Sequence, residues 1–396
     1  MPNTRPTWAY SLPAALVLMA PFDLLASLAM DIYLPAVAAM PRALGTTPEI
    51  VQLTLSLYLL GIGVGQVLFG PVSDRIGRRP VLLVGALVFA ASSALLASTT
   101  WVAGFVALRL VQALGASAAL VATFATVRDV YGDQSESATI YGTFSSMLAF
   151  VPALGPILGA ALLASFGWQS IFWLLALLAV PPVSHAAFRW HETKPNGDIG
   201  AGSAGPILRS PSFWFYTLAF GTAMGTFFVF LSIAPRILIA DAGYSEMQFG
   251  LSFATTAIVM VITARFAGSF VTRWGIDRCL KRGMALLMIG AAVLAAAWLV
   301  APPGFSTLIL PMWIMAIGIV MTVSVTANGA LAAFADRAGT AVAIYFAGHS
   351  IIVSVLGTAA VLLLGGDTAW PLVGFTAPLS MIVILVGRWR GCNTGR

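Results

Sequence analysis

Long apolar runs separated by short polar connections extend over most of this chain. A helix needs about 20 mostly apolar residues to cross a bilayer, and the run from Leu12 to Val37 meets that length with only two charged residues, Asp23 and Asp31. The remaining runs resemble it in length and character. The pattern predicts twelve membrane-spanning helices, over residues 12–36, 50–70, 80–99, 102–126, 138–163, 169–188, 211–235, 246–268, 283–301, 306–327, 339–363 and 370–387.

Composition supports an all-α polytopic membrane protein. Hydrophobic residues make up 59% of the chain and charged residues only 9%, whereas soluble domains carry about 25% charged residues. Mean hydropathy is +0.95. The two cysteines, Cys279 and Cys392, fall in segments expected on the cytosolic side, which argues against a disulfide framework. Only three histidines occur and no paired acids accompany them, so we expect no metal site.

The positions of the basic residues predict the orientation. If the N-terminus is cytosolic, most of the 20 Lys and Arg residues fall in cytosolic segments, and the outer loops hold only Arg42 and Arg236. This is the bias that the positive-inside rule describes. We therefore expect a multi-pass membrane protein with both termini in the cytosol. The net charge of +6 then reflects topology, and no nucleic-acid partner is expected.

The second half of the sequence repeats features of the first. Residues 189–210 form the longest connection and are rich in Gly, Pro and charge, as linkers are. They divide the chain into an N-terminal six-helix half, 1–188, and a C-terminal six-helix half, 211–396. The turn GPVSDRIGRR at 70–79 is echoed 198 positions later by GSFVTRWG at 268–275. Further pairs at similar offsets are Pro35 with Pro235 and Gly115 with Gly318. Two like repeats are typical of transporters with a central site.

The turn at 70–79 resembles the complete loop signature of the major facilitator superfamily, G-x-x-x-D-R-x-G-R-R. Gly70 suits a close approach at a helix end, and Gly77 suits a turn. Asp74 is placed to pair with a basic residue near the positive end of a neighbouring helix. We expect these contacts to latch the two halves in one state, while the arginines also anchor the topology. The expected latch residues are Gly70, Asp74, Arg75, Gly77, Arg78 and Arg79.

Two acids in the first predicted span are the main candidates for chemistry. Asp23 and Asp31 lie eight residues apart, which on a helix is a rise of about 12 Å and a rotation of about 80°, and Ser27 lies between them. A charge deep in a span costs about 3 kcal/mol on insertion scales and faces the protein interior or a water cavity. We expect Asp23 and Asp31 to carry protons and Asp23 to contact substrate. A structural hydrogen bond to a neighbouring helix is the alternative.

The fourth predicted span carries a basic counterpart. Arg109 with Gln112 and Gly115 resembles the family's span 4 motif, R-x-x-Q-x-x-G. We expect Asp31 and Arg109 to approach each other, directly or through Gln112, since both lie near the outer end of their spans. His349, in the eleventh span, fits a packed, hydrogen-bonded imidazole better than a proton relay.

The fifth predicted span contains FVPALGPILGA, which resembles the antiporter motif of drug exporters. Prolines bend a helix and glycines permit tight helix contacts, so this segment would pack against the opposite half and seal a leak. Ala149 and Ala160 depart from the motif, because glycine is common at both positions. The motif residues are Pro152, Gly155, Pro156 and Gly159.

The expected substrate cavity is mostly apolar, which suits a compact and weakly polar molecule. The candidate substrate-binding residues are Asp23, Ser27, Tyr58, Arg109, Gln112, Met147, Met224, Phe227, Phe228 and Tyr345.

Nearly the whole chain resembles the phenicol exporters of the twelve-span drug–proton antiporter group. The densest stretches include APFDLLASLAMDIYLPAV and SSMLAFVPALGPILGA. The resemblance implies proton-coupled efflux of chloramphenicol and florfenicol by alternating-access antiport, with Asp23, Asp31 and Arg109 at functional positions. It also implies drug and protons as partners and a location in the bacterial cytoplasmic (inner) membrane. We expect a monomer, because the two halves already supply the pseudo-symmetric pair, and no cofactor, because the proton gradient drives transport.

Other functions remain open at this point. No nucleotide-binding G-x-x-x-x-G-K-[ST] loop occurs, which disfavours ATP-driven export by this chain. A broader multidrug or metabolite exporter, or a symporter, would share the fold. A membrane enzyme is disfavoured, because the spans lack a convincing nucleophile–base pair or metal set. A receptor with a transporter fold is a further alternative.

Overall fold

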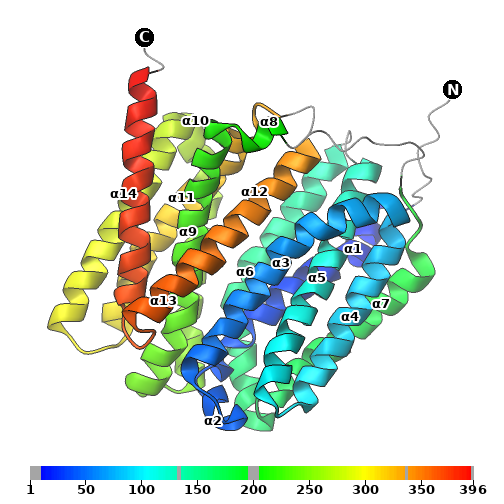
Figure 1. Ribbon diagram of the computed structural model, residues 1–396, viewed down its shortest axis with the longest axis horizontal. Coiled ribbons are helices and arrows are strands. Elements are labelled where there is room, and N and C mark those ends of the chain that lie inside the picture. The colour runs from blue at the N-terminus through cyan, green and yellow to red at the C-terminus, as the bar shows by residue number, and fades with distance from the viewer. Residues whose placement is uncertain (1–9, 132–134, 195–204, 335–337, 394–396) are drawn as a thin grey trace.

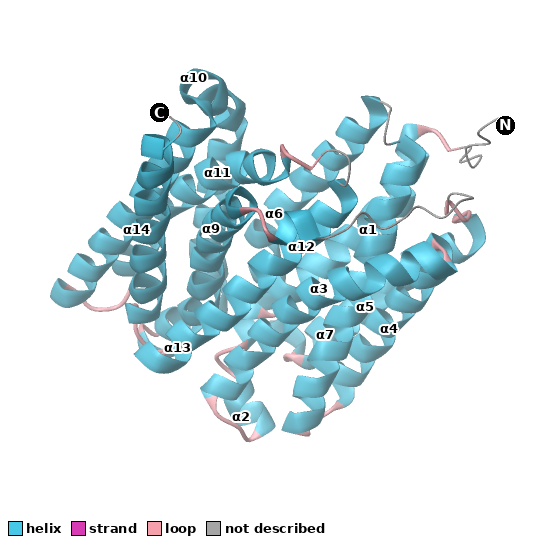
Figure 2. Ribbon diagram, turned by 45° about the horizontal axis from the view of Figure 1, so that its top comes forward, coloured by secondary structure: helices cyan, strands magenta, loops and turns pink. Residues whose placement is uncertain are grey.

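The structure is a computed structural model that describes residues 10–131, 135–194, 205–334 and 338–393. It is 89% helical, and the described residues form no strand. The helices run side by side with short connections between them (Figures 1 and 2). The predicted all-α architecture is confirmed.

We call the helices before residue 190 the N-terminal group. Pro21, Pro71, Pro152 and Pro156 lie inside long helices of this group, where each removes a backbone donor. In chain order its elements are α1 Leu12–Asp31, η1 Leu34–Ala36, α2 Met40–Leu44, α3 Pro48–Ile76, α4 Arg78–Ser98, α5 Val102–Tyr131, α6 Ser135–Phe166 and α7 Gln169–Arg189.

We call the helices from residue 205 onward the C-terminal group. Its elements are α8 Gly205–Leu208, α9 Pro211–Pro235, η2 Arg236–Asp241, α10 Glu246–Val300, η3 Phe305–Ile309, α11 Leu310–Leu331, α12 Ala338–Ile352, η5 Val353–Gly357, α13 Thr358–Leu364 and α14 Trp370–Asn393. Gly275, with φ 73° and ψ 170°, interrupts the 55 residues of α10.

The helices match the predicted spans. Ten helices in the described part of the chain are long and apolar enough to cross a membrane. One of them, α10, contains two predicted spans on either side of Gly275, and α6 covers the remaining one. Each of the twelve predicted runs therefore falls on a helix. The division into two halves with a linker at 189–210 stays a prediction.

The sequence repeat has a counterpart in helix packing. A Cβ placed on Gly115 of α5 would lie 2.7 Å from the carbonyl oxygen of Gly85, on α4. A Cβ placed on Gly318 of α11 would lie 2.7 Å from the carbonyl oxygen of Gly283, on α10. Gly85 and Gly283 are again 198 positions apart. Glycine thus permits the same backbone-to-backbone approach in both groups.

The two groups pack on each other mainly through α6 against α10 and α3 against α12. Polar contacts add to this near the start of α3. The amide Nε2 of Gln52 donates to the carbonyl of Ser232 (3.1 Å), and Thr358 donates to Ser56 (2.6 Å). In Figure 1 the connection from α2 into α3 lies at the bottom, whereas the end of α14 lies at the top. These contacts therefore join the groups at the end away from the end of α14.

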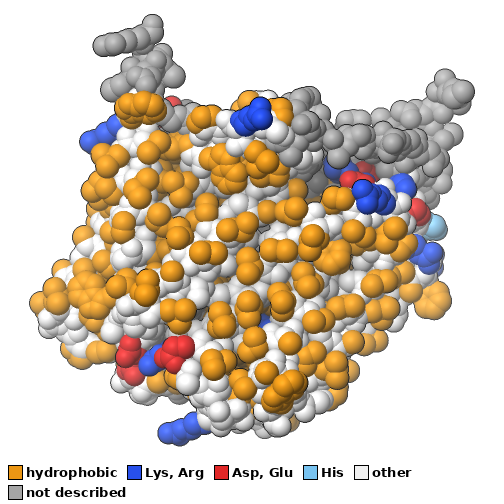
Figure 3. Space-filling model, viewed as in Figure 1, with side chains coloured by type: hydrophobic (Ala, Val, Ile, Leu, Met, Phe, Trp, Pro, Cys, Tyr) orange, Lys and Arg blue, Asp and Glu red, His pale blue; other side chains and the backbone are white. Residues whose placement is uncertain are grey.

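The outer surface is apolar. Large hydrophobic side chains are exposed along many helices, including Leu68, Leu177, Phe266 and Leu385. On the face drawn in Figure 3, hydrophobic side chains cover the middle, and charged side chains gather mainly near the upper and lower edges. An apolar middle between charged edges, as on this face, fits a bilayer. Together with the ten long apolar helices in the described residues, it identifies the chain as a multi-pass membrane protein.

Candidate functional site

Arg109 is the centre of the candidate site. It lies on α5 with no exposed surface, among aromatic rings from three other parts of the chain. Its guanidinium carbon lies 4.5 Å from the ring centre of Tyr58, 4.9 Å from that of Tyr33 and 5.8 Å from that of Phe172. Rings at these distances attract a cation through their negative faces. Helices α3, α5 and α7 and the end of α1 therefore meet at this one charge.

The hydrogen bonds of Arg109 correct one prediction. Its Nη1 donates to the side-chain oxygen of Gln112 (2.7 Å) and to the carbonyl oxygen of Ala29 (3.2 Å). Gln112 in turn donates to the hydroxyl of Ser93 (2.8 Å). Among the described residues, no ion pair or hydrogen bond joins Arg109 to Asp31, directly or through Gln112. The expected pairing is wrong in this structure because α1 presents the carbonyl of Ala29, rather than the Asp31 carboxylate, to Arg109.

Asp31 lies instead against the glycine-rich segment of α6. A Cβ placed on Gly155 would lie 2.9 Å from the Cβ of Asp31, and one on Gly159 would lie 2.0 Å from the carbonyl oxygen of Ile32. Only glycine permits α6 to come this close to the end of α1. Asp31 is buried, at 6% exposure.

The same segment of α6 contacts the C-terminal group. A Cβ placed on Gly250 of α10 would lie 3.2 Å from backbone atoms of Pro156 and Ile157. The segment is thus wedged between α1 and α10. The sequence predicted packing against the opposite half, and the structure confirms that contact; its role as a seal stays a prediction.

Asp23 is a second buried carboxylate that has no ion-pair partner in the part of the chain that the structure describes. It is 4% exposed, and its Oδ2 has no hydrogen-bond partner among the described residues. Ser27, one turn further along α1, is half-buried. Between the two acids, the Tyr58 hydroxyl donates to the carbonyl oxygen of Ala26 (2.7 Å) and ties α3 to α1. Asp23, Asp31 and Arg109 therefore lie in one region but are not paired with one another.

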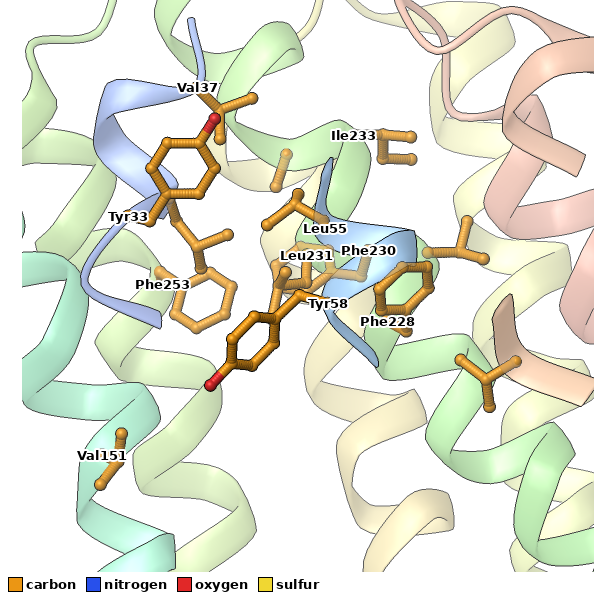
Figure 4. Close-up of a cluster of buried hydrophobic side chains, with 14 of the residues drawn as sticks. Tyr33, Val37, Leu55, Tyr58, Val151, Phe228, Phe230, Leu231, Ile233 and Phe253 are labelled. Atoms are coloured by element: carbon orange, nitrogen blue, oxygen red, sulfur yellow. The ribbon is translucent and has the colours of Figure 1, made fainter. Parts of the chain in front are cut away.

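Tyr58 and Phe228, two of the expected substrate contacts, lie in one buried cluster at the junction of the two groups (Figure 4). The Tyr58 hydroxyl points away from Phe228. Phe227, on the neighbouring position of α9, is half-buried with its ring 6.0 Å from that of Phe253. Met224 is half-buried against this cluster.

Tyr345 does not join that cluster. Its ring stacks on Phe220 at 4.8 Å, and its hydroxyl donates to Thr326 (2.9 Å). It belongs to a separate cluster within the C-terminal group, and its role in substrate binding stays a prediction. Aromatic residues in spans serve packing as well as pockets, and the pattern alone does not separate the two. The side chain of Met147 lies outside the described residues.

His349 is packed as predicted. Its Nδ1 lies 3.0 Å from the carbonyl oxygen of Phe346, and its ring lies 4.7 Å from that of Phe220. The buried imidazole is therefore hydrogen-bonded and covered by an aromatic ring.

The loop motif forms a network within the N-terminal group. Arg78 is 1% exposed and binds Asp74 (2.5 Å), Asp129 (2.8 Å) and Ser73 (3.1 Å). Gly77 has φ 109°, as its role in the turn predicts. Asp74 pairs with a basic residue as expected, but that residue belongs to its own turn.

One expectation about this motif stays a prediction and another is corrected. The hydrogen bonds found for Asp74, Arg75, Arg78 and Arg79 in the described part of the chain all end on residues before 195, so no latch between the two halves is formed in this state. A latch in another state of the transport cycle stays a prediction. A Cβ on Gly70 would meet nothing within 4 Å, so no close approach requires glycine there.

The sequence did not single out the partners of these motif residues. Tyr33, Phe172 and the Ala29 carbonyl around Arg109 carry no motif, and contact between them depends on tertiary packing. Asp129 was detectable in principle, because it follows Arg128 at the end of a long apolar run.

Comparisons with known proteins agree with this architecture. A family model described as Major Facilitator Superfamily matches residues 22–358. A chloramphenicol resistance protein of Pseudomonas aeruginosa is 48% identical, with 96% of this chain and 91% of the relative covered. The multidrug resistance protein MdtM of Salmonella typhimurium is 30% identical, with 72% of each chain covered. The crystal structure of a D-xylose–proton symporter superposes with a TM-score of 0.73 at 15% identity, over 94% of this chain and 97% of the other, which shows the shared fold.

Proposed function

This chain belongs to the Major Facilitator Superfamily, a family of membrane transporters, and from that premise we propose that it exports phenicol antibiotics in exchange for protons. Chloramphenicol and florfenicol are the proposed substrates. The expected result of transport is drug resistance in the cell that carries the protein. Membership of a transporter family also indicates a transporter rather than an enzyme.

One observation carries the substrate assignment. The 48% identity to a chloramphenicol resistance protein extends over 96% of the chain, so it includes the candidate site as well as the scaffold. The site has properties that suit such a drug. It combines a buried cluster of aromatic and aliphatic side chains with a few polar groups, Asp23, Arg109 and Tyr58, as small-molecule sites do.

The two buried acids support proton coupling. A buried carboxylate without a counterion is costly in its charged form, and neither Asp23 nor Asp31 has an ion-pair partner among the described residues. Each acid therefore suits a cycle of protonation and release. We propose that Asp23 exchanges its proton with drug and that Asp31 exchanges its proton as α6 and α1 separate.

The contacts between the two groups support alternating access. Gln52–Ser232, Ser56–Thr358 and an ion pair between Glu49 and Arg236 (3.2 Å) all join the groups at the end away from the end of α14. With both termini in the cytosol, as the basic residues predict, that end faces outward. We propose that this arrangement is open to the cytoplasm and that the export cycle breaks these contacts.

The test is drug and proton movement in inverted membrane vesicles with an imposed pH gradient. We expect chloramphenicol to release protons from acidified vesicles that contain the wild-type protein. Asp23→Asn is expected to abolish this release, and Asp31→Asn to reduce it. Cys279→Ser is a matched control, because Cys279 is buried in the C-terminal group away from the acids.

Two outcomes would contradict the proposal. No proton release by either phenicol, with the protein folded and inserted, would remove the substrate assignment. Full pH-dependent efflux by Asp23→Asn would remove Asp23 from proton coupling.

A broader multidrug exporter is the second candidate. Its support is the 30% identity to the multidrug resistance protein MdtM over 72% of the chain. Competition by a panel of unrelated cationic and neutral drugs against chloramphenicol separates the two. A bacterial inner-membrane location, a monomeric state, the absence of a nucleic-acid partner and transport without a cofactor are part of the proposal.

A further inference from the structure

The chain segment after α7 folds back onto the start of α4. The Oε1 of Glu192 accepts a hydrogen bond from the backbone N–H of Arg78 (2.8 Å), and Oε2 accepts one from that of Arg79 (3.2 Å). Oε1 also accepts the N–H groups of Thr193 (3.0 Å) and Lys194 (2.9 Å). One carboxylate thus caps the 21-residue helix α4 from a distant part of the sequence, at the end where helices favour negative charge.

Gly77 makes room for this carboxylate. A Cβ on Gly77 would lie within contact distance of Glu192, 2.4 Å from Oε2 and 2.8 Å from Cδ. Its φ of 109° is also unfavourable for any residue with a side chain. The turn therefore requires glycine at this position, and a Cβ there would also displace the Glu192 carboxylate.

Other contacts fix the same segment. The Nζ of Lys194 donates to the carbonyl oxygen of Arg75 (2.6 Å), and the hydroxyl of Thr193 donates to Thr126 (3.4 Å). Trp190 is buried with its ring edge against Phe22 (6.0 Å). Residues 190–194, which we call the strap, therefore belong to the N-terminal group, although the sequence placed them in the linker.

The equivalent turn in the C-terminal group lacks this arrangement. Gly275 has φ 73° and ψ 170°, close to the backbone geometry of Gly77, yet a Cβ placed on it would meet nothing within 4 Å. The residue 198 positions after Glu192 is Arg390, which reverses the charge. The turn itself therefore does not need a carboxylate cap, and Glu192 serves a purpose specific to the N-terminal group.

We propose that Glu192 is a positioning residue for transport, which locks the strap to the loop motif so that α4, α7 and the Arg78 network move as one body. Arg78 follows Gly77 directly, and its bonds to Asp74 and Asp129 depend on where α4 begins. This inference rests on the proposed export function for its effect on turnover, but the clamp itself does not.

The first test is Glu192→Gln in nanodiscs, with hydrogen exchange and drug transport measured on the same preparation. Gln keeps one acceptor oxygen but turns an NH₂ group toward the N–H of Arg79. We expect the amides of residues 78, 79, 193 and 194 to exchange about fivefold faster, the effect typical of losing a helix cap. The kcat of chloramphenicol export is expected to fall by a similar factor, with KM unchanged, because the strap does not touch the drug site.

Gly77→Ala and Gly275→Ala are a matched pair for the second test. Both place a side chain at positive φ, but only Gly77→Ala displaces the Glu192 carboxylate. We expect Gly77→Ala to reproduce the faster exchange and lower kcat of Glu192→Gln. The double variant is expected to be no worse than Gly77→Ala alone, and Gly275→Ala is expected to leave the exchange of residues 190–194 unchanged.

Unchanged exchange at residues 78 and 193 in folded Glu192→Gln would overturn the clamp. Faster exchange with unaltered kcat would overturn its role in transport. If the wild-type protein moves no phenicol, the proposed function fails, while the exchange data on Glu192→Gln and on the glycine pair still decide whether the clamp exists.

Discussion

Replacing Arg109 by methionine should abolish transport and leave the fold intact. The guanidinium is fully buried, and two of its nitrogens, Nε and Nη2, have no hydrogen-bond partner among the described residues. The position related to Arg109 by the offset between Gly115 and Gly318 is occupied by a buried methionine, Met312. An unbranched apolar side chain of similar length is thus compatible with the equivalent place in the other group.

The expected stability follows from opposing contributions of similar size. The variant loses charge-assisted hydrogen bonds to Gln112 and Ala29, about 1.5–3 kcal/mol each, and ring contacts to Tyr33 and Tyr58, about 2 kcal/mol in total. It also removes the cost of burying a cation, several kcal/mol, and that of two unpaired donors, about 1–3 kcal/mol each. The free energy of unfolding should therefore change by no more than about 2 kcal/mol, as for other buried charges replaced by apolar residues.

Thermal melting in detergent and chloramphenicol transport in vesicles test both expectations on one preparation. We expect the melting temperature of Arg109→Met to lie within about 4 °C of the wild type, the shift typical of such a small change in a large domain, and transport to be lost. Met312→Leu is the matched control and should leave both measurements unaltered. Retained transport in Arg109→Met would refute a functional role for the charge, and a collapse of melting temperature would refute the energetic argument.

Three further substitutions test the contacts of α6 and the ion pair that joins the two groups at the outer end. Gly159→Ala should impair both stability and transport, because its Cβ would lie 2.0 Å from the Ile32 carbonyl oxygen, and overpacking costs about 1–3 kcal/mol. Gly250→Ala, with its nearest contact at 3.2 Å, should be tolerated, and equal melting temperatures would contradict this. Arg236→Gln removes the ion pair to Glu49. Because this ion pair is partly exposed, we expect the population in which α3 and α9 are separated at the outer end to rise by at most about fivefold. Spin-label distances between α3 and α9 measure that population, and no shift at low salt would contradict the proposed role of the ion pair.

The sequence determined the scaffold because the physics of a bilayer acts locally. A run of apolar residues long enough to cross a membrane must satisfy its own backbone hydrogen bonds, so it forms a helix wherever it lies in the fold. The predicted runs accordingly match the helices, including the two that Gly275 separates within α10. The positions of Gly77 and Gly275 also predicted turns, because positive φ is a local property of the backbone.

The sequence identified Asp23, Asp31 and Arg109 as unusual for the same local reason, since each is a charged residue inside an apolar run. It did not determine their partners. Arg109 donates a hydrogen bond to Gln112, which is three residues further along the same helix, as the spacing suggested. The pairing with Asp31 failed because it depends on which group of α1 faces α5, and in the structure that group is the carbonyl of Ala29.

Only the tertiary structure decided which groups meet. The ring cage of Arg109 joins residues from the end of α1, from α3 and from α7, and the clamp of Glu192 joins residues more than a hundred positions apart. The pattern of apolar residues along the chain indicates which face of a helix is apolar. The rotation of each helix about its axis and its depth in the membrane depend on the packing of all its neighbours. For this protein the sequence by itself fixed the helices, the turns and the charged residues inside the spans. The contacts among these residues depend on tertiary packing, because close backbone approach at glycines determines which helices lie side by side.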